Sequence, residues 1–83
     1  MAVRAYILIG TAGGTAATVY KGLHRLAVVD AKVLSADTVA GPFDVIALLE
    51  SEDLNRLGRA VAEGIQRIYG VERTTTCLIM GPA

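Results

Sequence analysis

Apolar and polar residues follow two different periods in the first third of the chain. Residues 3–10 read VRAYILIG, an aromatic and β-branched run that predicts a strand. The cluster TAGG at residues 11–14 predicts a loop. Apolar residues then recur three and four positions apart, which predicts a helix, with Thr15 or Thr11 as its N-cap. Its apolar face comprises Ala16, Val19, Tyr20, Leu23, Leu26 and Ala27.

Two further apolar runs follow, and a turn separates them. Residues 31–39 (AKVLSADTV) alternate imperfectly between polar and apolar side chains, which predicts a half-exposed strand. Residues 40–42 (AGP) combine the two residues that most favour turns. Residues 43–50 (FDVIALLE) are almost continuously apolar, as in a strand that is covered on both faces.

The second helix has the clearest period in the chain. Apolar residues step by three, four, four and three positions, at Leu54, Leu57, Val61, Ile65 and Ile68. Ser51 is the predicted N-cap, and Glu52 and Asp53 suit the positive end of the helix dipole. Gly70 is expected to end the helix, and residues 71–80 (VERTTTCLIM) predict a last strand.

This order of elements, β-α-β-β-α-β, predicts an α+β fold, the ferredoxin-like sandwich, as one domain over residues 1–83. The strands at 3–10 and 43–50 are the most apolar and are expected at the centre of the sheet. The other two carry polar residues, as edge strands do. Both helices are expected on one face, so a second copy is expected to cover the other face, as in a dimeric α/β barrel.

Composition supports self-association. The chain has only 83 residues, yet 53% are apolar and the mean hydropathy is +0.50, more than so small a monomer easily buries. Eight basic residues balance eight acidic ones, which argues against direct nucleic-acid binding. One cysteine excludes an intramolecular disulfide and a cysteine-based zinc site. The lone thiol and the lack of a membrane-spanning stretch or a targeting segment favour the cytoplasm.

Few residues suggest catalysis. His24 is the only histidine, and no carboxylate lies three or four positions from it. Cys77 is flanked by Thr76 and Leu78 and is expected to be a buried, inert thiol. The glycine-rich GTAGGT at residues 10–15 lacks the spacing of a phosphate loop, so its glycines indicate only a permissive loop. No metal site, cofactor or enzymatic activity is expected.

Two polar features remain as candidate binding groups. Asp44 stands at the mouth of an apolar strand, where it could accept hydrogen bonds from a ligand ammonium or from nearby backbone N–H groups. Thr74 and Thr76 share one face of the last strand and would present two hydroxyls to a carboxylate or an amide. The plainer interpretation is that threonine favours edge strands and aspartate favours turns.

Taken together, these features resemble the effector domain of the Lrp/AsnC regulators, also called the RAM domain. The resemblance rests on the opening strand, on Val29 after the first helix, and on Gly41-Pro42-Phe43-Asp44 followed by VIALLES. It continues through IYGV at residues 68–71 into the ERTTTCLIM strand. Family members usually carry an additional helix-turn-helix domain. A sequence that starts at the effector domain is similar to the stand-alone form, for which no direct DNA contact is implied.

The resemblance implies a module that binds an amino acid and regulates transcription or amino-acid metabolism. Dimers would form through facing sheets and assemble into octamers or decamers, with the effector between dimers. The implied ligand-binding residues are Gly41, Phe43, Asp44 and, as further partners, Thr74 and Thr76. Asp44 would bind the α-ammonium, whereas backbone N–H groups near Gly41 and the threonine hydroxyls would bind the carboxylate. Implied partners are full-length relatives or metabolic enzymes.

Two alternatives stay open. One is a small enzyme on the same dimeric α/β barrel, of the monooxygenase or isomerase type, for which His24 and Tyr6 are the neutral acid–base candidates. A ligand-sized pocket inside the subunit would favour that alternative. The other is an assembly partner without a small ligand, in which side chains fill the sites between dimers.

Overall fold

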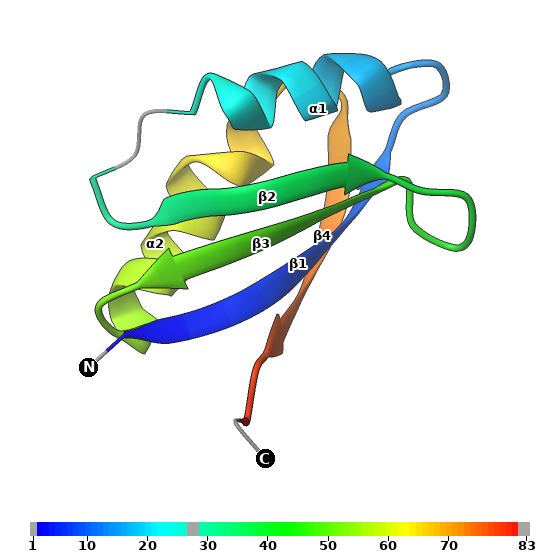
Figure 1. Cartoon of the computed structure of the whole chain (residues 1–83). Helices are drawn as coiled ribbons and strands as arrows, with labels where there is room; N and C mark the ends of the chain where they lie inside the picture. The colour runs from blue at the N-terminus through cyan, green and yellow to red at the C-terminus, as the bar shows by residue number, and fades with distance from the viewer. Residues whose placement is uncertain (1, 27–28, 82–83) are drawn as a thin grey trace.

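The sheet has the strand order that the sequence predicts. The computed structural model describes residues 2–26 and 29–81. Its elements are β1 (Val3–Thr11), α1 (Ala16–His24), β2 (Lys32–Thr38), β3 (Val45–Ser51), α2 (Leu54–Glu63), the 3₁₀ turn η1 (Ile65–Arg67) and β4 (Val71–Leu78). All pairs are antiparallel in the order β2-β3-β1-β4, so β1 and β3 are central (Figure 1). The ferredoxin-like α+β fold is confirmed.

The core lies between the sheet and the helices, which cover one face. Alternate residues of the central strands are fully buried there, namely Ala5, Ile7, Ile9, Val45, Ala47 and Leu49. The helical layer supplies Val19, Leu23, Leu57, Ala60, Val61 and Ile65. Burial of one such large aliphatic side chain contributes about 1.5–3 kcal/mol, so this layer accounts for most of the stabilisation within one subunit.

The opposite face of the sheet has no cover within the described residues and stays partly apolar. Tyr6 of β1 is 46% exposed, and it lies opposite Leu48 of β3 and Cys77 of β4. The prediction that Cys77 is buried is wrong: the side chain is exposed on this face. The error arises because an apolar neighbourhood in the sequence does not tell which face of an edge strand is covered.

Both helices are present, but only one predicted N-cap position is right, and its side chain does not make the capping hydrogen bond. Thr15 does occupy the N-cap of α1, but its hydroxyl donates to the Ala12 carbonyl (2.7 Å) instead of accepting a backbone N–H. Thr11 ends β1. Ser51 ends β3, and its hydroxyl donates to the Asp30 carbonyl. Asp53 caps α2 instead, through a carboxylate oxygen that accepts the Arg56 N–H at 2.7 Å.

The helices are also shorter than predicted. α1 ends at His24, and Ala27, which the period assigned to its apolar face, lies outside the described residues. α2 ends at Glu63 with Gly64 as its C-cap, and η1 continues the chain. The apolar period survives this break, since Ile65 is fully buried and Ile68 packs against the core.

The prediction that Gly70 ends the second helix is wrong, because Gly64 is the C-cap of α2 and Ile68 is that of η1. Gly70 has a φ of +101°, a conformation that favours glycine, and it joins η1 to β4. A Cβ at this position would lie 2.6 Å from the Thr15 hydroxyl oxygen. The glycine therefore lets the start of β4 approach the start of α1. Among the described residues, no helix is long and apolar enough to cross a membrane.

Candidate functional site

The turn between β2 and β3 contains three of the predicted ligand-binding residues. Gly41 is exposed at the tip of the turn with φ +155°, and a Cβ there would meet no atom within 4 Å. The Val39 N–H donates to the Asp44 carbonyl (2.9 Å) and closes the turn. The backbone at Gly41 is therefore accessible from outside the turn.

Asp44 fixes the turn to β1 by two hydrogen bonds. Its backbone N–H donates to the Ile9 carbonyl at 2.9 Å, and one carboxylate oxygen accepts the Thr11 N–H at 2.8 Å. Of the two roles that the sequence left open, the structure contains the contact with a backbone N–H group. The second carboxylate oxygen has no hydrogen-bond donor among the described residues, which leaves it available for an ammonium group.

Arg73 of β4 fixes the same turn from the other side, and the sequence analysis did not identify it. Its guanidinium donates to the Pro42 carbonyl at 2.8 Å, and its central carbon lies 5.2 Å from the centre of the Phe43 ring. The guanidinium thus stacks on a ligand-binding candidate. The sequence carries no signal for this contact because the strand register brings the two segments together.

Thr74 and Thr76 share a face, as predicted, and that face carries the helices. They lie opposite Ile9 and Ile7 of β1, whose side chains are buried in the core. Thr74 already accepts a hydrogen bond from the Gln66 side-chain amide at 2.9 Å. No hydrogen bond among the described residues joins either threonine to the turn.

The turn and the threonines nevertheless lie at the same level of β1. Ile9 accepts the Asp44 N–H from the β3 side and pairs with Thr74 on the β4 side. Thr76 pairs one inward-facing residue further along, with Ile7. The candidate site therefore consists of two patches, separated by the width of β1, rather than of one closed pocket.

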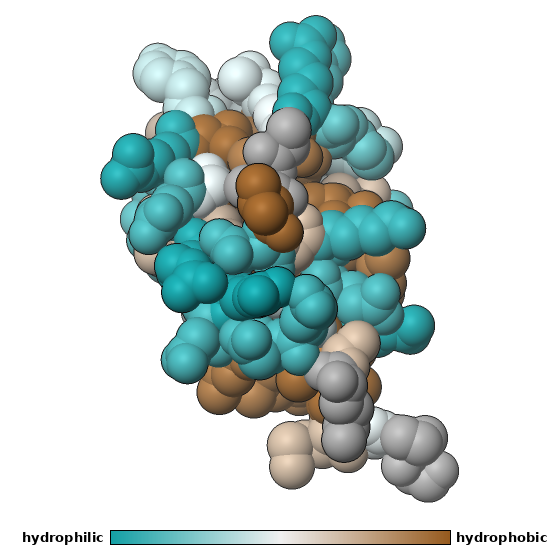
Figure 2. Space-filling view, turned by 90° about the vertical axis from the view of Figure 1, so that its left-hand side faces the viewer, coloured by the Kyte–Doolittle hydropathy of each residue, from teal (hydrophilic) through white to brown (hydrophobic). Residues whose placement is uncertain are grey.

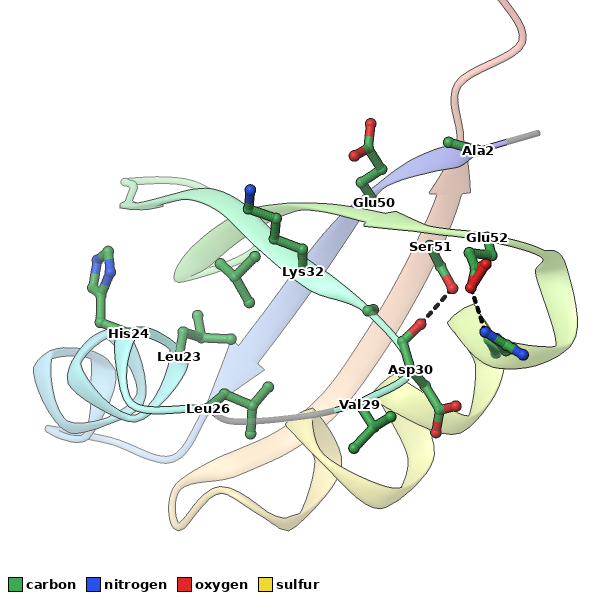
Figure 3. Close-up of a pocket in the computed structure, with 13 residues that line it drawn as sticks. Ala2, Leu23, His24, Leu26, Val29, Asp30, Lys32, Glu50, Ser51 and Glu52 are labelled. Carbon is green, nitrogen blue, oxygen red and sulfur yellow. Dashed lines mark hydrogen bonds and ion pairs between the residues drawn. The ribbon is translucent and has the colours of Figure 1, made fainter.

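A separate cavity lies at the other end of the sheet. It has a volume of about 610 Å³ and opens where β2 begins and β3 ends (Figure 3). Leu23, Leu26 and Val33 contribute apolar side chains to its lining, and Lys32 and Glu50 contribute charged ones. It contains none of the predicted ligand-binding residues.

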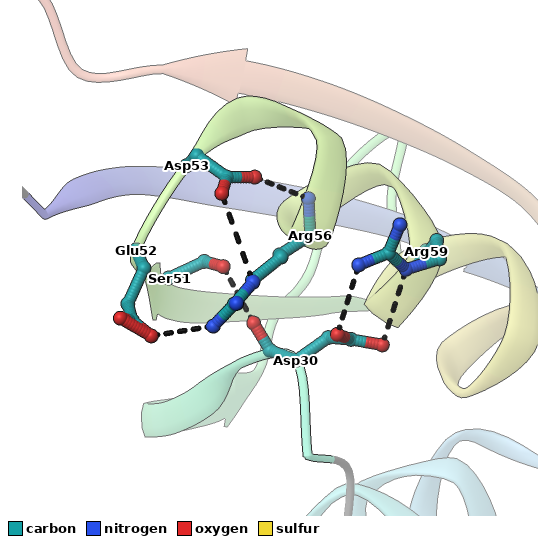
Figure 4. A network of polar contacts seen from close by, with 6 residues as sticks. All are labelled: Asp30, Ser51, Glu52, Asp53, Arg56 and Arg59. Atoms are coloured by element: carbon teal, nitrogen blue, oxygen red, sulfur yellow. Dashed lines mark hydrogen bonds and ion pairs between the residues drawn. The ribbon is translucent and has the colours of Figure 1, made fainter.

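Most of the charged residues near this cavity are paired with one another. Arg59 contacts Asp30 at 3.3 Å and so ties the segment before β2 to α2 (Figure 4). Arg56 contacts Glu52 and Asp53, which directly precede α2. The hydrogen bond from Arg59 to Asp30 raises the pKa of Arg59 above its ordinary value. Hydrophilic side chains form a belt over this end of the molecule, with hydrophobic patches on either side (Figure 2). Such exposed pairs fix local geometry and contribute little to stability.

The two acid–base candidates do not form a catalytic pair. His24 is on α1 and borders the cavity, where its ring packs edge-on against Tyr20 with centroids 4.5 Å apart. Tyr6 points to the uncovered face of the sheet, away from the helices. The sheet separates them. Within residues 2–26 and 29–81, no group of three His, Cys, Asp or Glu side chains could hold a metal ion.

Comparison with known proteins identifies one family. A family model described as the Lrp/AsnC ligand binding domain matches residues 4–82. The crystal structure of TTHA0845 from Thermus thermophilus is similar with a TM-score of 0.84 and 28% identity, over 98% of this chain and 96% of that one. Among curated proteins, none matches the chain.

Two larger regulators share the fold at lower identity. Escherichia coli AsnC matches with a TM-score of 0.83 and 16% identity, over 96% of this chain and 52% of AsnC. The transcriptional regulator NMB0573 from Neisseria meningitidis, solved as a complex with L-Met, matches with a TM-score of 0.77 and 18% identity. That match covers 95% of this chain and 50% of NMB0573, so the present chain spans about half the length of both regulators.

Proposed function

The chain belongs to the Lrp/AsnC family as a regulatory effector domain, and from this premise we propose that it binds an amino acid and assembles into rings. In this proposal residues 1–83 form one domain that acts in the cytoplasm as a non-enzymatic module without a cofactor. The observation that carries it is the double attachment of the Gly41–Asp44 turn, which keeps one Asp44 oxygen and the Gly41 backbone accessible.

The ligand-binding residues are Gly41, Phe43, Asp44, Thr74 and Thr76. The free oxygen of Asp44 binds the α-ammonium, because a carboxylate is the natural partner of a primary ammonium group. Backbone N–H groups near Gly41 and the threonine hydroxyls bind the carboxylate. The L-Met complex of NMB0573 supports an amino acid as the class of ligand, although the two proteins share only 18% identity.

A second copy of the chain covers the open face of the sheet. Tyr6, Leu8, Ile46 and Leu48 give this face an apolar centre that the described residues leave partly exposed. Face-to-face packing of two such sheets removes this surface from water and forms the dimeric α/β barrel. Dimers then assemble into octamers or decamers, and a neighbouring dimer closes the divided ligand site.

The module acts through protein partners and makes no direct contact with DNA. Its eight basic residues balance its eight acidic ones, and four of the acidic residues pair with Arg4, Arg56 or Arg59 on the surface. Such a surface offers no basic stripe to phosphates. Full-length members of the family or metabolic enzymes are the proposed partners, and the ligand would modulate that association.

Isothermal titration of the chain with each of the twenty amino acids tests the proposal. Native mass spectrometry, with and without ligand, would report the ring. We expect one amino acid or a small group of them to bind at micromolar to millimolar concentration, with a ring of eight or ten subunits. A folded ring that binds none of them at millimolar concentration would exclude the amino-acid ligand and favour an assembly partner without one.

The cavity beside His24 is the one observation that favours a second candidate, a small enzyme on this fold. It is of ligand size and lies within one subunit. Two-dimensional NMR during the same titration separates the candidates. Shifts at Gly41, Phe43 and Asp44 support the regulatory module, whereas shifts at Leu23, His24 and Lys32 would favour the enzyme.

A further inference from the structure

We propose that Arg73 is the positioning residue of the ligand site, because it holds the Gly41–Asp44 turn in its binding conformation. This inference rests on the proposed function only where it describes the site as a ligand site. The attachment of the turn by Arg73 is a separate physical claim and can be tested without any ligand.

Arg73 lies on the face of β4 that points away from the helices. It pairs with Gly10 of β1, next to the pair formed by Ile9 and Thr74, whose side chains point toward the helices. From this position its side chain crosses the end of β1 and reaches the turn. There it donates to the Pro42 carbonyl at 2.8 Å and stacks on the Phe43 ring at 5.2 Å.

Gly10 makes this path possible. A Cβ at Gly10 would lie 2.8 Å from the central guanidinium carbon of Arg73 and 2.9 Å from its Cγ, well inside van der Waals contact. The Arg73 side chain therefore lies flat on the backbone of β1. The glycine next to the TAGG loop thus has a specific role, which the sequence analysis interpreted only as loop freedom.

The guanidinium of Arg73 is held by a carbonyl and a ring rather than by an acid. Three other arginines, Arg4, Arg56 and Arg59, form ion pairs within the described residues, whereas Arg73 has no carboxylate within 4.0 Å there. A carboxylate partner would draw the guanidinium away from the turn. Its absence among the described residues leaves the planar fork for Pro42 and Phe43.

Asp44 and Arg73 thus hold two different points of one short segment. Asp44 attaches the C-terminal end of the turn to β1, and Arg73 attaches its centre to β4. Without Arg73, residues 41–43 would be held only where the turn joins β2 and β3, and no side chain would fix its middle. A ligand would then bear the entropic cost of ordering them, and its affinity would fall without any loss of a direct contact.

The test is a double-mutant cycle with Gly10→Ala and Arg73→Met, in which methionine keeps much of the apolar stem and removes the donors and the charge. Hydrogen exchange of the Val39 and Asp44 amides, which are hydrogen-bonded at the turn, is measured in the absence of ligand. Amino-acid affinity is measured by titration. Arg67→Met is the matched control, because the Arg67 side chain is exposed and forms no ion pair or side-chain hydrogen bond among the described residues.

We expect Arg73→Met to speed exchange of the turn amides and to weaken ligand binding about tenfold, because the ligand then bears the cost of ordering the turn. Gly10→Ala alone should have the same effect, because the added Cβ would displace the guanidinium. It should add little in the Arg73→Met background, where the guanidinium is absent and the flexible methionine stem, which no longer reaches the turn, can move away from the new Cβ. Loss of the ring-current shift of the Arg73 side-chain protons in Phe43→Leu would confirm the stacking.

Two outcomes would overturn the proposal. One is unchanged turn exchange in Arg73→Met, and the other is full additivity of the two substitutions. If the wild-type chain binds no amino acid but the exchange cycle behaves as expected, the proposed function fails and the role of Arg73 in holding the turn stands.

Discussion

Asp44 serves the fold and the proposed ligand with different oxygens. One carboxylate oxygen accepts the Thr11 N–H, and the other has no donor among the described residues. The sequence suggested both a backbone partner and a ligand partner for this residue as alternatives. The geometry makes them compatible, since a carboxylate can accept several hydrogen bonds at once.

Substitution of Asp44 separates the two roles. Asp44→Asn keeps an oxygen for Thr11 and removes the charge, so we expect a loss of stability below about 1 kcal/mol. Asp44→Ala leaves the Thr11 N–H without its partner, and we expect a loss of about 1–3 kcal/mol. Both variants should lose amino-acid binding, because both lack the anion that pairs with the ammonium.

Urea unfolding and calorimetric titration on the same samples measure both effects. If Asp44→Asn bound the ligand with wild-type affinity, the carboxylate would have no role in binding and would be purely structural.

Gly70 and Gly58 form a matched pair for a second prediction. Gly70→Ala forces a side chain into positive φ and against Thr15, so we expect a loss of at least about 2 kcal/mol. Gly58 lies within α2, and a Cβ added there would meet no atom within 4 Å apart from the backbone of its own helix. Gly58→Ala should therefore stabilise the protein by about 0.5–1 kcal/mol. Thermal and chemical unfolding would check both, and equal effects at the two positions would contradict this view of Gly70.

At the scale of the elements, the sequence predicts their order and their place in the sheet, because both follow from hydrophobic period. Residues 43–50 and 54–68 are continuous patterns, and their strand and helix are found within about three residues of the expected start. The ends are less predictable. Ser51 and Thr15 each have a hydroxyl that can cap a helix. Instead, the Ser51 hydroxyl donates to the distant Asp30 carbonyl, and the Thr15 hydroxyl donates to the nearby Ala12 carbonyl.

The candidate site shows the same limit. The alternation of β4 predicts that Thr74 and Thr76 share a face, and the turn residues follow from their composition and the family resemblance. The contribution of Arg73 depends on register: it requires β4 to pair with β1 so that residue 73 meets Gly10. No local pattern encodes that pairing.

The cap of α2 gives a prediction at this scale. Asp53→Ala removes the side-chain acceptor of the Arg56 N–H and should cost about 0.5–2 kcal/mol. Ser51→Ala should also destabilise, since the buried hydroxyl then no longer ties β3 to Asp30. The two are distinguished by hydrogen exchange: only Asp53→Ala should increase exchange in the first turn of α2. Faster exchange there in Ser51→Ala would contradict the assignment of the cap.

At the scale of the whole molecule, one side of the sheet is complete and the other is not. The helices bury the centre of one face, whereas Tyr6, Leu8, Ile46 and Leu48 leave an apolar area on the other. The high apolar content of the chain, 53%, divides between these two faces. Association of the open faces therefore explains why the chain contains more apolar residues than the core of one small subunit needs.

Leu48→Arg tests the open face. A charge placed at its centre would be buried without a partner in the dimer, so we expect dissociation to monomers with the circular dichroism spectrum unchanged. Ala62→Arg, at an exposed position on the surface of α2, is the control and should leave the mass as in the wild type. Sedimentation velocity gives the result. An unchanged assembly in Leu48→Arg would place the interface elsewhere.

The pairing of β1 with β4 also has a consequence for folding during synthesis. Ala5 lies opposite Leu78, so a central strand of the sheet acquires its second neighbour only from the last strand of the fold. On the ribosome, β1 can pair with β3 early, but its other edge stays open until residues 71–78 have emerged. An apolar strand with an unpaired edge is prone to aggregation. The last strand to emerge is thus also the one that covers this open edge of the nascent protein.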